Sequence, residues 1–312
     1  MAIKHSFVSS KTEQSDPTLV GPNEWNNNHV IDSEIVLPDV AAPATPAVGN
    51  SALAPHAVSG RDMFGCQPGR GSLYTFQPHV GRKRVREIRP RSNATTLDRL
   101  GMDATVAAGT LTGRNMVTTN MFTAAHRVGH VSGAGAGNQA QLGDNTANHA
   151  WLGNAARLGG FHYVIRFGVS DASLVATANM FLGLAATVYA SDTAPQTLAN
   201  ILGIGCTSGD TALQIYGAGA AAQARTSLGA SFPCNTISTD WYEFAMFAPQ
   251  NANSVYYQVT RLNTGDVATG TLTGAQIPAN TQLLQFQTIR SNGGTAVAVA
   301  YDFGGVYIET DN

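Results

Sequence analysis

Short runs of aromatic and β-branched residues recur between turn residues from Gly160 to the C-terminus. Runs of this kind predict β-strands, and the alternation in Ser254–Leu262 favours a strand with one apolar face. Asn and Gly residues between the runs tolerate the positive φ that hairpin turns demand. The expected strands are His162–Val169, Met180–Val188, Ile201–Cys206, Leu213–Tyr216, Trp241–Phe247, Val255–Leu262, Thr269–Thr273, Leu283–Arg290, Val297–Phe303 and Gly305–Glu309.

Short strands at this spacing predict an all-β fold class, with an antiparallel β-sandwich of the jelly-roll or lectin-like type in residues 160–312. A short helix is expected there at Ser173–Asn179 or at Pro195–Leu202. Asn120–Val128, before the sandwich, has both helical and strand character, and the pattern does not decide between the two.

The chain before Gly160 has a much weaker apolar pattern. Residues 1–60 contain six prolines, each of which removes a backbone donor, and Pro38–Ala47 is typical of an extended linker. We therefore expect an extended N-terminal arm over residues 1–60. Residues 61–159 contain many Gly and Pro residues and are expected to form an irregular or intertwined shoulder with short strands.

Composition and charge narrow the function classes. Only 12% of the residues are charged and Gly occurs 33 times, which favours turn-rich β structure packed against partners. The sequence has no apolar run of about 18 residues, and its N-terminus lacks the apolar core of a signal peptide. We therefore expect neither membrane insertion nor secretion by a signal peptide.

Two separated parts of the sequence carry a family resemblance. The segments are Met1–Lys11, Pro17–Ile31, Gly159–Asp171, Val259–Thr273 and Val306–Asp311. The N-terminal segments, with a Pro-x-x-Trp-Asn-x-x-His element, look like the opening of tail-fibre and minor virion proteins of tailed bacteriophages, and the others resemble a domain of phage virion proteins. The resemblance implies virion attachment through the arm, for which Trp25 and His29 are the candidate residues.

A tail-fibre or tail-tip subunit that mediates attachment to the host surface is the function that this resemblance favours. It would be made in the host cytoplasm and reside in the virion tail, as a homo-oligomer for which a trimer is favoured, in contact with other virion proteins. The alternative is a purely architectural virion protein, such as a capsid decoration, head fibre or collar protein, without receptor binding.

Catalysis and metal binding find little support in the sequence, so no enzyme activity, catalytic residue, metal or cofactor is predicted. All eight His residues lie at or before His162, which leaves the predicted sandwich poor in general bases. Asp240 and Glu243 are three positions apart and would face opposite sides of a strand. His126 and His130 have the spacing of neighbours on a helix, but no third ligand is evident.

The three cysteines, Cys66, Cys206 and Cys234, lack the spacing of a metal or redox motif. A Cys206–Cys234 disulfide is one alternative. Buried thiols are favoured, because a protein made in a reducing cytoplasm usually keeps them.

Receptor contacts are expected from aromatic side chains, because their rings stack on sugars or protein surfaces. The candidates for a host glycan or protein are Trp241, Tyr256 and Tyr257. Nine of the 18 basic residues fall within residues 60–99, including the block Arg82–Arg91. Salt bridges between subunits through Arg82, Arg84 and Arg86 are favoured over nucleic-acid binding, because no aromatic residues are interleaved with them.

Overall fold

The computed structural model describes residues 44, 46–47, 50–58, 60–68, 74–75, 83–91, 93–146, 150–156, 158–189 and 192–311. Internal contacts divide the chain into residues Met1–Pro38 and Asp39–Asn312. The predicted attachment residues Trp25 and His29 lie outside the described residues, as does Arg82.

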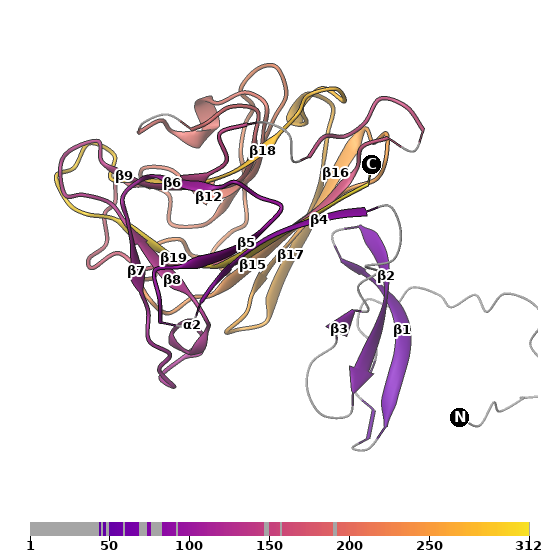
Figure 1. Ribbon diagram of the computed structural model, residues 1–312, viewed down its shortest axis with the longest axis horizontal. Helices are drawn as coiled ribbons and strands as arrows, with labels where there is room; N and C mark the ends of the chain where they lie inside the picture. Colours follow the sequence, from indigo (N-terminus) through magenta and orange to yellow (C-terminus); the bar gives the residue numbers. More distant parts are fainter. Residues whose placement is uncertain are drawn as a thin grey trace, which may run out of the picture. The chain divides into compact units, whose positions relative to one another are not determined.

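Two antiparallel sheets form a β-sandwich, which confirms the predicted all-β fold class (Figure 1). The strands of the first sheet, in order across it, are β17 (Asp266–Thr273), β16 (Ser254–Arg261), β15 (Tyr242–Ala248), β10 (Phe161–Val169), β19 (Ala300–Asp311), β4 (Lys83–Pro90) and β5 (Leu97–Leu100). β8 (Val128–Val131) pairs with the beginning of β19 and with β7 (Thr110–Gly113). We call this the nine-stranded sheet.

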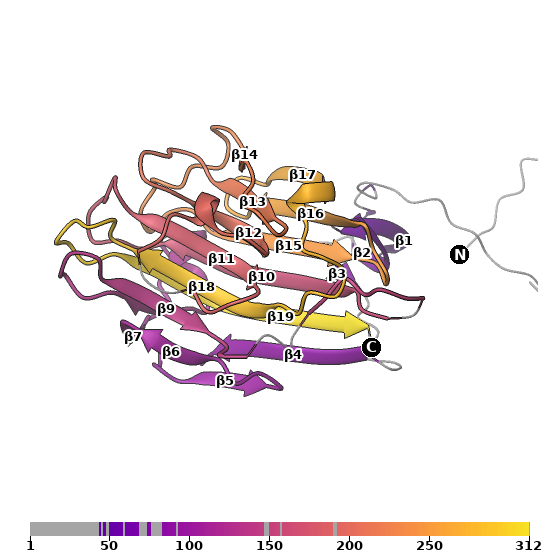
Figure 2. The ribbon, with the colours of Figure 1, turned by 90° about the horizontal axis from the view of Figure 1, so that it is seen from above.

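The second, seven-stranded sheet covers one face of the first, and in both views its strands run in nearly the same direction as those beneath it (Figure 2). Its strands, in order, are β14 (Thr226–Ser227), β13 (Gln214–Ala218), β12 (Ile201–Cys206), β11 (Asn179–Ala185), β18 (Gln285–Ser291), β9 (Gln139–Gly143) and β6 (Thr105–Ala108).

The core lies between the two sheets, where side chains from alternate positions of facing strands meet. β10 contributes Phe161, Tyr163, Ile165 and Phe167, and β11 contributes Met180, Leu182 and Leu184. Each such side chain contributes roughly 1.5–3 kcal/mol when it is fully buried. A second apolar cluster, which includes Phe181 and Tyr216, lies on the other face of the seven-stranded sheet.

Strands that precede residue 160 and strands that follow it belong to the same two sheets. The sequence instead predicted that the sandwich begins at residue 160. β4, β5, β7 and β8 complete the nine-stranded sheet, while β6 and β9 complete the other. The predicted irregular shoulder therefore contains six strands of the sandwich. The reason is that the partners of these strands are far away in sequence: β4 pairs with β19 and β9 with β18.

The remaining elements lie outside the two sheets of the sandwich. β1 (Ser51–Val58), β2 (Arg61–Pro68) and β3 (Tyr74–Thr75) form a separate three-stranded sheet. The undecided segment Asn120–Val128 contains a one-turn helix, α2 (Met121–Ala124), and leads into β8. The 3-10 helices are η1 (Pro195–Thr197), within one of the two stretches where a helix was expected, and η2 (Gly274–Gln276). No helix in the described part of the chain is long and apolar enough to span a membrane.

Candidate functional site

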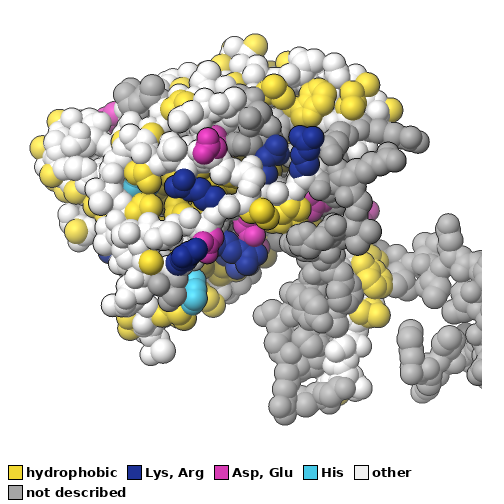
Figure 3. Space-filling view, in the orientation of Figure 1, with side chains coloured by type: hydrophobic (Ala, Val, Ile, Leu, Met, Phe, Trp, Pro, Cys, Tyr) yellow, Lys and Arg dark blue, Asp and Glu magenta, His cyan; other side chains and the backbone are white. Residues whose placement is uncertain are grey.

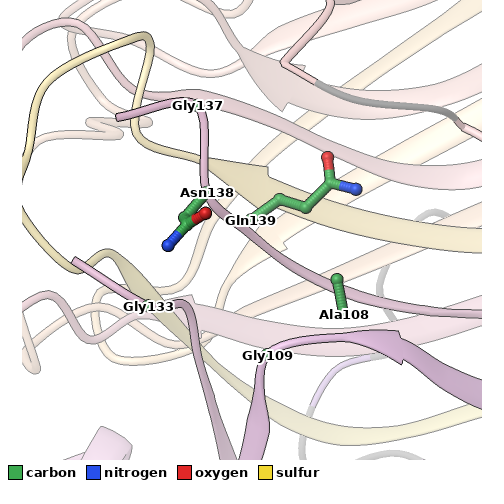
Figure 4. Close-up of a pocket in the computed structure, with 6 residues that line it drawn as sticks. All are labelled: Ala108, Gly109, Gly133, Gly137, Asn138 and Gln139. Atoms are coloured by element: carbon green, nitrogen blue, oxygen red, sulfur yellow. The ribbon is translucent and has the colours of Figure 1, made fainter. Parts of the chain in front are cut away.

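A hollow of about 400 Å³ lies where the turn between β6 and β7 approaches the connection between β8 and β9. Its lining consists of Ala108, Gly109, Gly133, Gly137, Asn138 and Gln139 (Figure 4). Two of these residues have polar side chains, and the glycines leave peptide groups uncovered. Figure 4 shows the two amide side chains leaving the strand in opposite directions, with Asn138 directed toward Gly133.

Glycines shape this hollow because the backbone comes too close for larger residues. Gly109 has a φ of +79°, and a Cβ there would lie 2.6 Å from the carbonyl oxygen of Val131. A Cβ at Gly133 would lie 2.5 Å from Nδ2 of Asn138. The Gly-rich segment before β9 therefore leaves room for the Asn138 side chain.

Asn292, in the connection between β18 and β19, forms hydrogen bonds with the loop that lines the hollow. Its side chain is fully buried, its Oδ1 accepts from the Gly137 N–H at 2.9 Å, and its Nδ2 donates to the Gly135 carbonyl at 2.7 Å. The Asn292 N–H donates to the Asn138 carbonyl at 3.1 Å. These bonds hold the loop without using the side chain of Asn138.

Gln139 belongs to a row of amide side chains on the face of the seven-stranded sheet that points away from the core. Its Nε2 donates to Oε1 of Gln141 at 3.2 Å, and Gln141 Nε2 donates to Oε1 of Gln287 at 3.3 Å. Gln287 Nε2 in turn donates to the Asp144 carbonyl at 2.7 Å. Within the described residues, the buried Oε1 of Gln139 has no hydrogen-bond partner. The row therefore ends at Gln139 with an acceptor that is buried.

The chemistry of this lining is neutral hydrogen bonding. Amide side chains and peptide groups offer both donors and acceptors, and none of the six lining residues is ionisable. Such a surface suits a ligand that carries hydroxyl groups. None of these six described residues carries a side chain that could act as a nucleophile or a general base.

The aromatic candidates lie elsewhere. Trp241 is 3% exposed and packs edge-on against Phe122, with 5.5 Å between the ring centroids. Tyr257 is 8% exposed and belongs to the main core. Tyr256 is half-buried and stacks on Phe247 at 6.5 Å. None of the three candidates lines the hollow, and Trp241 and Tyr257 contribute to packing.

The basic candidates lie on β4, where Arg84 is exposed and Arg86 is half-buried. Alternation along the strand puts both on the same side as Ile88, which is fully buried in the core. Burial and the neighbouring Arg84 lower the pKa of Arg86, against the opposing influence of Asp144. Arg84 is therefore the better placed of the two for contact with another subunit.

Charged side chains are sparse on the face that Figure 3 shows, where basic and acidic groups lie close together near the middle. Exposed ion pairs of this kind include Arg89 with Glu87 at 2.5 Å and Arg91 with Asp98 at 2.6 Å. Arg89 and Arg91 of the block are thus neutralised within the same chain.

Asp240 and Glu243 do not form a catalytic pair in the structure. Asp240 accepts hydrogen bonds from Arg261 at 2.7 Å and from Asn263 at 2.8 Å. Burial raises the pKa of Asp240, but hydrogen bonds from Thr236, Asn263 and Arg261 outweigh it and lower the pKa. Glu243 pairs with Arg166 at 2.7 Å. A carboxylate held ionised in this way is not suited to act as a general acid.

His126 and His130 do not share a helical face, because the chain between them leaves α2 and enters β8. His126 is exposed, whereas His130 is fully buried. Among the described residues, no group of three or more His, Cys, Asp or Glu side chains could hold a metal ion. Cys206 and Cys234 are free and buried, as expected for buried thiols rather than a disulfide.

No family model and no curated protein matches the sequence. Among solved structures, peanut lectin with a nine-residue peptide is similar, with 10% identity, 74% of this chain and 98% of that chain covered, and a TM-score of 0.48. A second similar structure is lectin I from Ulex europaeus in complex with the methyl glycoside of α-L-fucose. It is 9% identical, the alignment covers 74% of this chain and 98% of the lectin chain, and the TM-score is 0.46. A third is a protein of unknown function from Shewanella oneidensis. It is 11% identical, the alignment covers 73% of this chain and 86% of that chain, and the TM-score is 0.46.

The sandwich itself thus defines the class to which the chain belongs, that of antiparallel two-sheet β proteins. At these identities and TM-scores, the similarities carry no argument about ligand or function.

Proposed function

We propose that the chain is a subunit of a tail fibre or tail tip of a tailed bacteriophage and attaches the virion to a glycan on the host surface. The observation that carries the binding part is the neutral, hydrogen-bonding hollow lined by Asn138, Gln139 and glycine backbone. Sugar hydroxyls act as both donors and acceptors, as do amide and peptide groups.

The virion part of the proposal rests on the sequence resemblance of the N-terminal and C-terminal segments to phage virion proteins. A homotrimer is the proposed assembly. Several copies on one particle would make weak sites effective, because the first contact raises the effective concentration of the others. A shallow site with few polar groups is therefore sufficient for attachment, and no catalytic step is needed.

A purely architectural virion protein is the second candidate, and a specific observation favours it. None of the described residues that line the exposed hollow is aromatic, and the aromatic candidates Trp241 and Tyr257 are buried. On this alternative, the Gly-rich loop would serve only to connect β8 and β9.

The test compares binding of the full-length protein to immobilised bacterial surface polysaccharides with binding of the double variant Asn138→Ala, Gln139→Ala. We expect the original protein to bind and the double variant to bind at least about tenfold more weakly, since each lost hydrogen bond contributes about 1 kcal/mol. Gln223→Ala, which removes an amide outside the hollow, is the matched control and should bind normally.

Light scattering on the same sample should give three times the chain mass of 32.6 kDa. Equal binding by the original protein and the double variant would reject the hollow as the site. Absence of binding by a folded oligomer to any polysaccharide would favour the architectural role.

A further inference from the structure

Cys206 and Cys234 come from distant parts of the sequence but meet in the fold. Cys206 ends β12, and Cys234 lies in the connection between β14 and β15. The Cys234 N–H donates to the Thr211 carbonyl at 3.1 Å, and Ala212 forms a β-bridge with Pro233, so the two segments lie side by side. The Cys234 thiol donates to the Asp210 carbonyl at 3.3 Å, both cysteines line the same small cavity, and each residue is 4% exposed.

The surroundings make the two sulfur atoms chemically different. The neighbouring Cys234 thiol lowers the pKa of Cys206, burial opposes this, and the Arg290 guanidinium lowers it further. Arg290 is fully buried and paired with Asp171, so its charge is fixed beside the thiol. The neighbouring Cys206 thiol and burial raise the pKa of Cys234. Cys206 thus has the character of a nucleophile, and Cys234 that of a protonated partner.

A small cavity gives access to this pair. It has a volume of about 100 Å³, and its lining includes both cysteines together with Asp210, Thr207, Asn235 and Arg290. Such a space is large enough for a few water molecules or a hydrogen peroxide molecule. It is too small for a second protein thiol, which favours reaction between the two cysteines over cross-linking of chains.

We propose that Cys206 and Cys234 form a redox-active dithiol, which peroxide converts into a disulfide between the end of β12 and the connection that precedes β15. The inference is independent of glycan binding. A chain made in a reducing cytoplasm would keep both thiols, and the bond would close when the protein meets an oxidising exterior. It would then cross-link a loop of the folded sandwich.

The reaction balances with one peroxide per disulfide. The Cys206 thiolate attacks one peroxide oxygen, an S–O bond forms, the O–O bond breaks, and the leaving hydroxide is protonated to water. Cys234 then attacks the sulfenic acid sulfur, the S–S bond forms and the S–O bond breaks. The second hydroxide takes the proton of Cys234 and leaves as water. Two thiol sulfurs are oxidised and one peroxide is reduced to two waters.

The experiment uses the full-length protein with Cys66→Ser, so that only the pair remains. One equivalent of hydrogen peroxide is added to the native protein, remaining thiols are alkylated, and peptides are mapped by mass spectrometry. We expect a mass lower by two hydrogen atoms, a linked peptide pair containing both cysteines, and a melting temperature several degrees higher than that of the reduced protein. A thiol reductant should reverse all three changes.

Single variants separate a redox pair from two inert buried thiols. Cys234→Ser should stop at a sulfenic acid on Cys206, trapped by dimedone, whereas Cys206→Ser should leave Cys234 about tenfold less reactive toward peroxide. The proposal is overturned if both thiols of the native Cys66→Ser protein stay alkylatable after peroxide treatment. It is also overturned if peroxide oxidises Cys206 or Cys234 to sulfinic acid and no linked peptide forms. Both results come from the Cys66→Ser protein alone and do not require the single variants.

Discussion

His130 in β8 is a fully buried histidine with both ring nitrogens in contact with polar partners. Its Nε2 lies 2.8 Å from the Ala108 carbonyl, to which it must donate, and its Nδ1 lies 3.0 Å from the Tyr301 hydroxyl. Burial lowers the pKa of His130 to about 4, although the hydrogen bond to Ala108 acts in the opposite direction. The folded protein therefore holds this ring neutral at pH values where an unfolded chain would protonate it.

This predicts a loss of stability on acidification. The unfolded histidine has a pKa of about 6.5, so the contribution of His130 is fully present above that pH and is lost as the pH falls toward about 4. The full loss amounts to roughly 3 kcal/mol. Urea unfolding at pH 7.5 and pH 4.5 should show a smaller pH effect in His130→Gln than in the original protein.

His126→Gln is the control for that measurement, because His126 is exposed on the same connection and should retain the original pH dependence. If His130→Gln and the original protein lose the same free energy of unfolding between the two pH values, the proton is not linked to folding through His130.

At the scale of elements, buried ion pairs attach the segment around α2 to the nine-stranded sheet. Asp302 in β19 accepts from Arg127 at 2.8 Å and from Arg114 at 3.2 Å, and its side chain is 1% exposed. Arg127 also donates to the carbonyls of Thr123 and Ala125. A single carboxylate thus pairs with two guanidinium groups, of which that of Arg127 also binds carbonyls at the end of the helix.

We therefore expect Asp302→Asn to destabilise the protein by about 3 kcal/mol, because it leaves Arg127 buried without its counter-charge. Glu243→Gln is the matched control on the same sheet. Its pair with Arg166, whose side chain is 57% exposed, should contribute less than about 1 kcal/mol. Urea unfolding of both variants measures the difference, and equal losses would contradict the importance of burial.

Element prediction from sequence succeeded where the signal is local. The strand expected at Ile201–Cys206 is β12 as observed, and that expected at Val255–Leu262 differs from β16 by one residue at each end. The strands expected at Val297–Phe303 and Gly305–Glu309 are a single strand, β19. The glycines between them indicate a turn, but in the fold they accommodate a shift of register against β10 between Arg166 and Phe167.

At the scale of the whole molecule, what the sequence could not predict depends on contacts between distant segments. β9 is only five residues long, and its place in the sheet depends on β18, which pairs Gln287 with Gly143. The hollow was not predicted for the same reason: Asn292 and Gly109 approach its loop from elsewhere in the chain. Nor can a sequence distinguish a buried Trp241 from an exposed one.

The same dependence leads to a prediction about truncation. A chain of residues 160–312 lacks β4 and β8, which flank β19, and β9, which flanks β18. It also loses core side chains such as Ile88 and Leu142, and it exposes the unpaired edges of two central strands. We expect this fragment to aggregate or to lack a cooperative thermal transition. Residues 39–312, which retain both sheets, should melt cooperatively at the temperature of the full chain.

Circular dichroism during heating and size-exclusion chromatography distinguish the two fragments. A cooperative transition of residues 160–312 near that of residues 39–312 would mean that the strands before residue 160 add little to stability, and that the sandwich folds around β10, β11 and β15 alone. Loss of the transition only in the shorter fragment would mean that the first strands are an integral part of the fold. In that case any detachable attachment arm must end before β4.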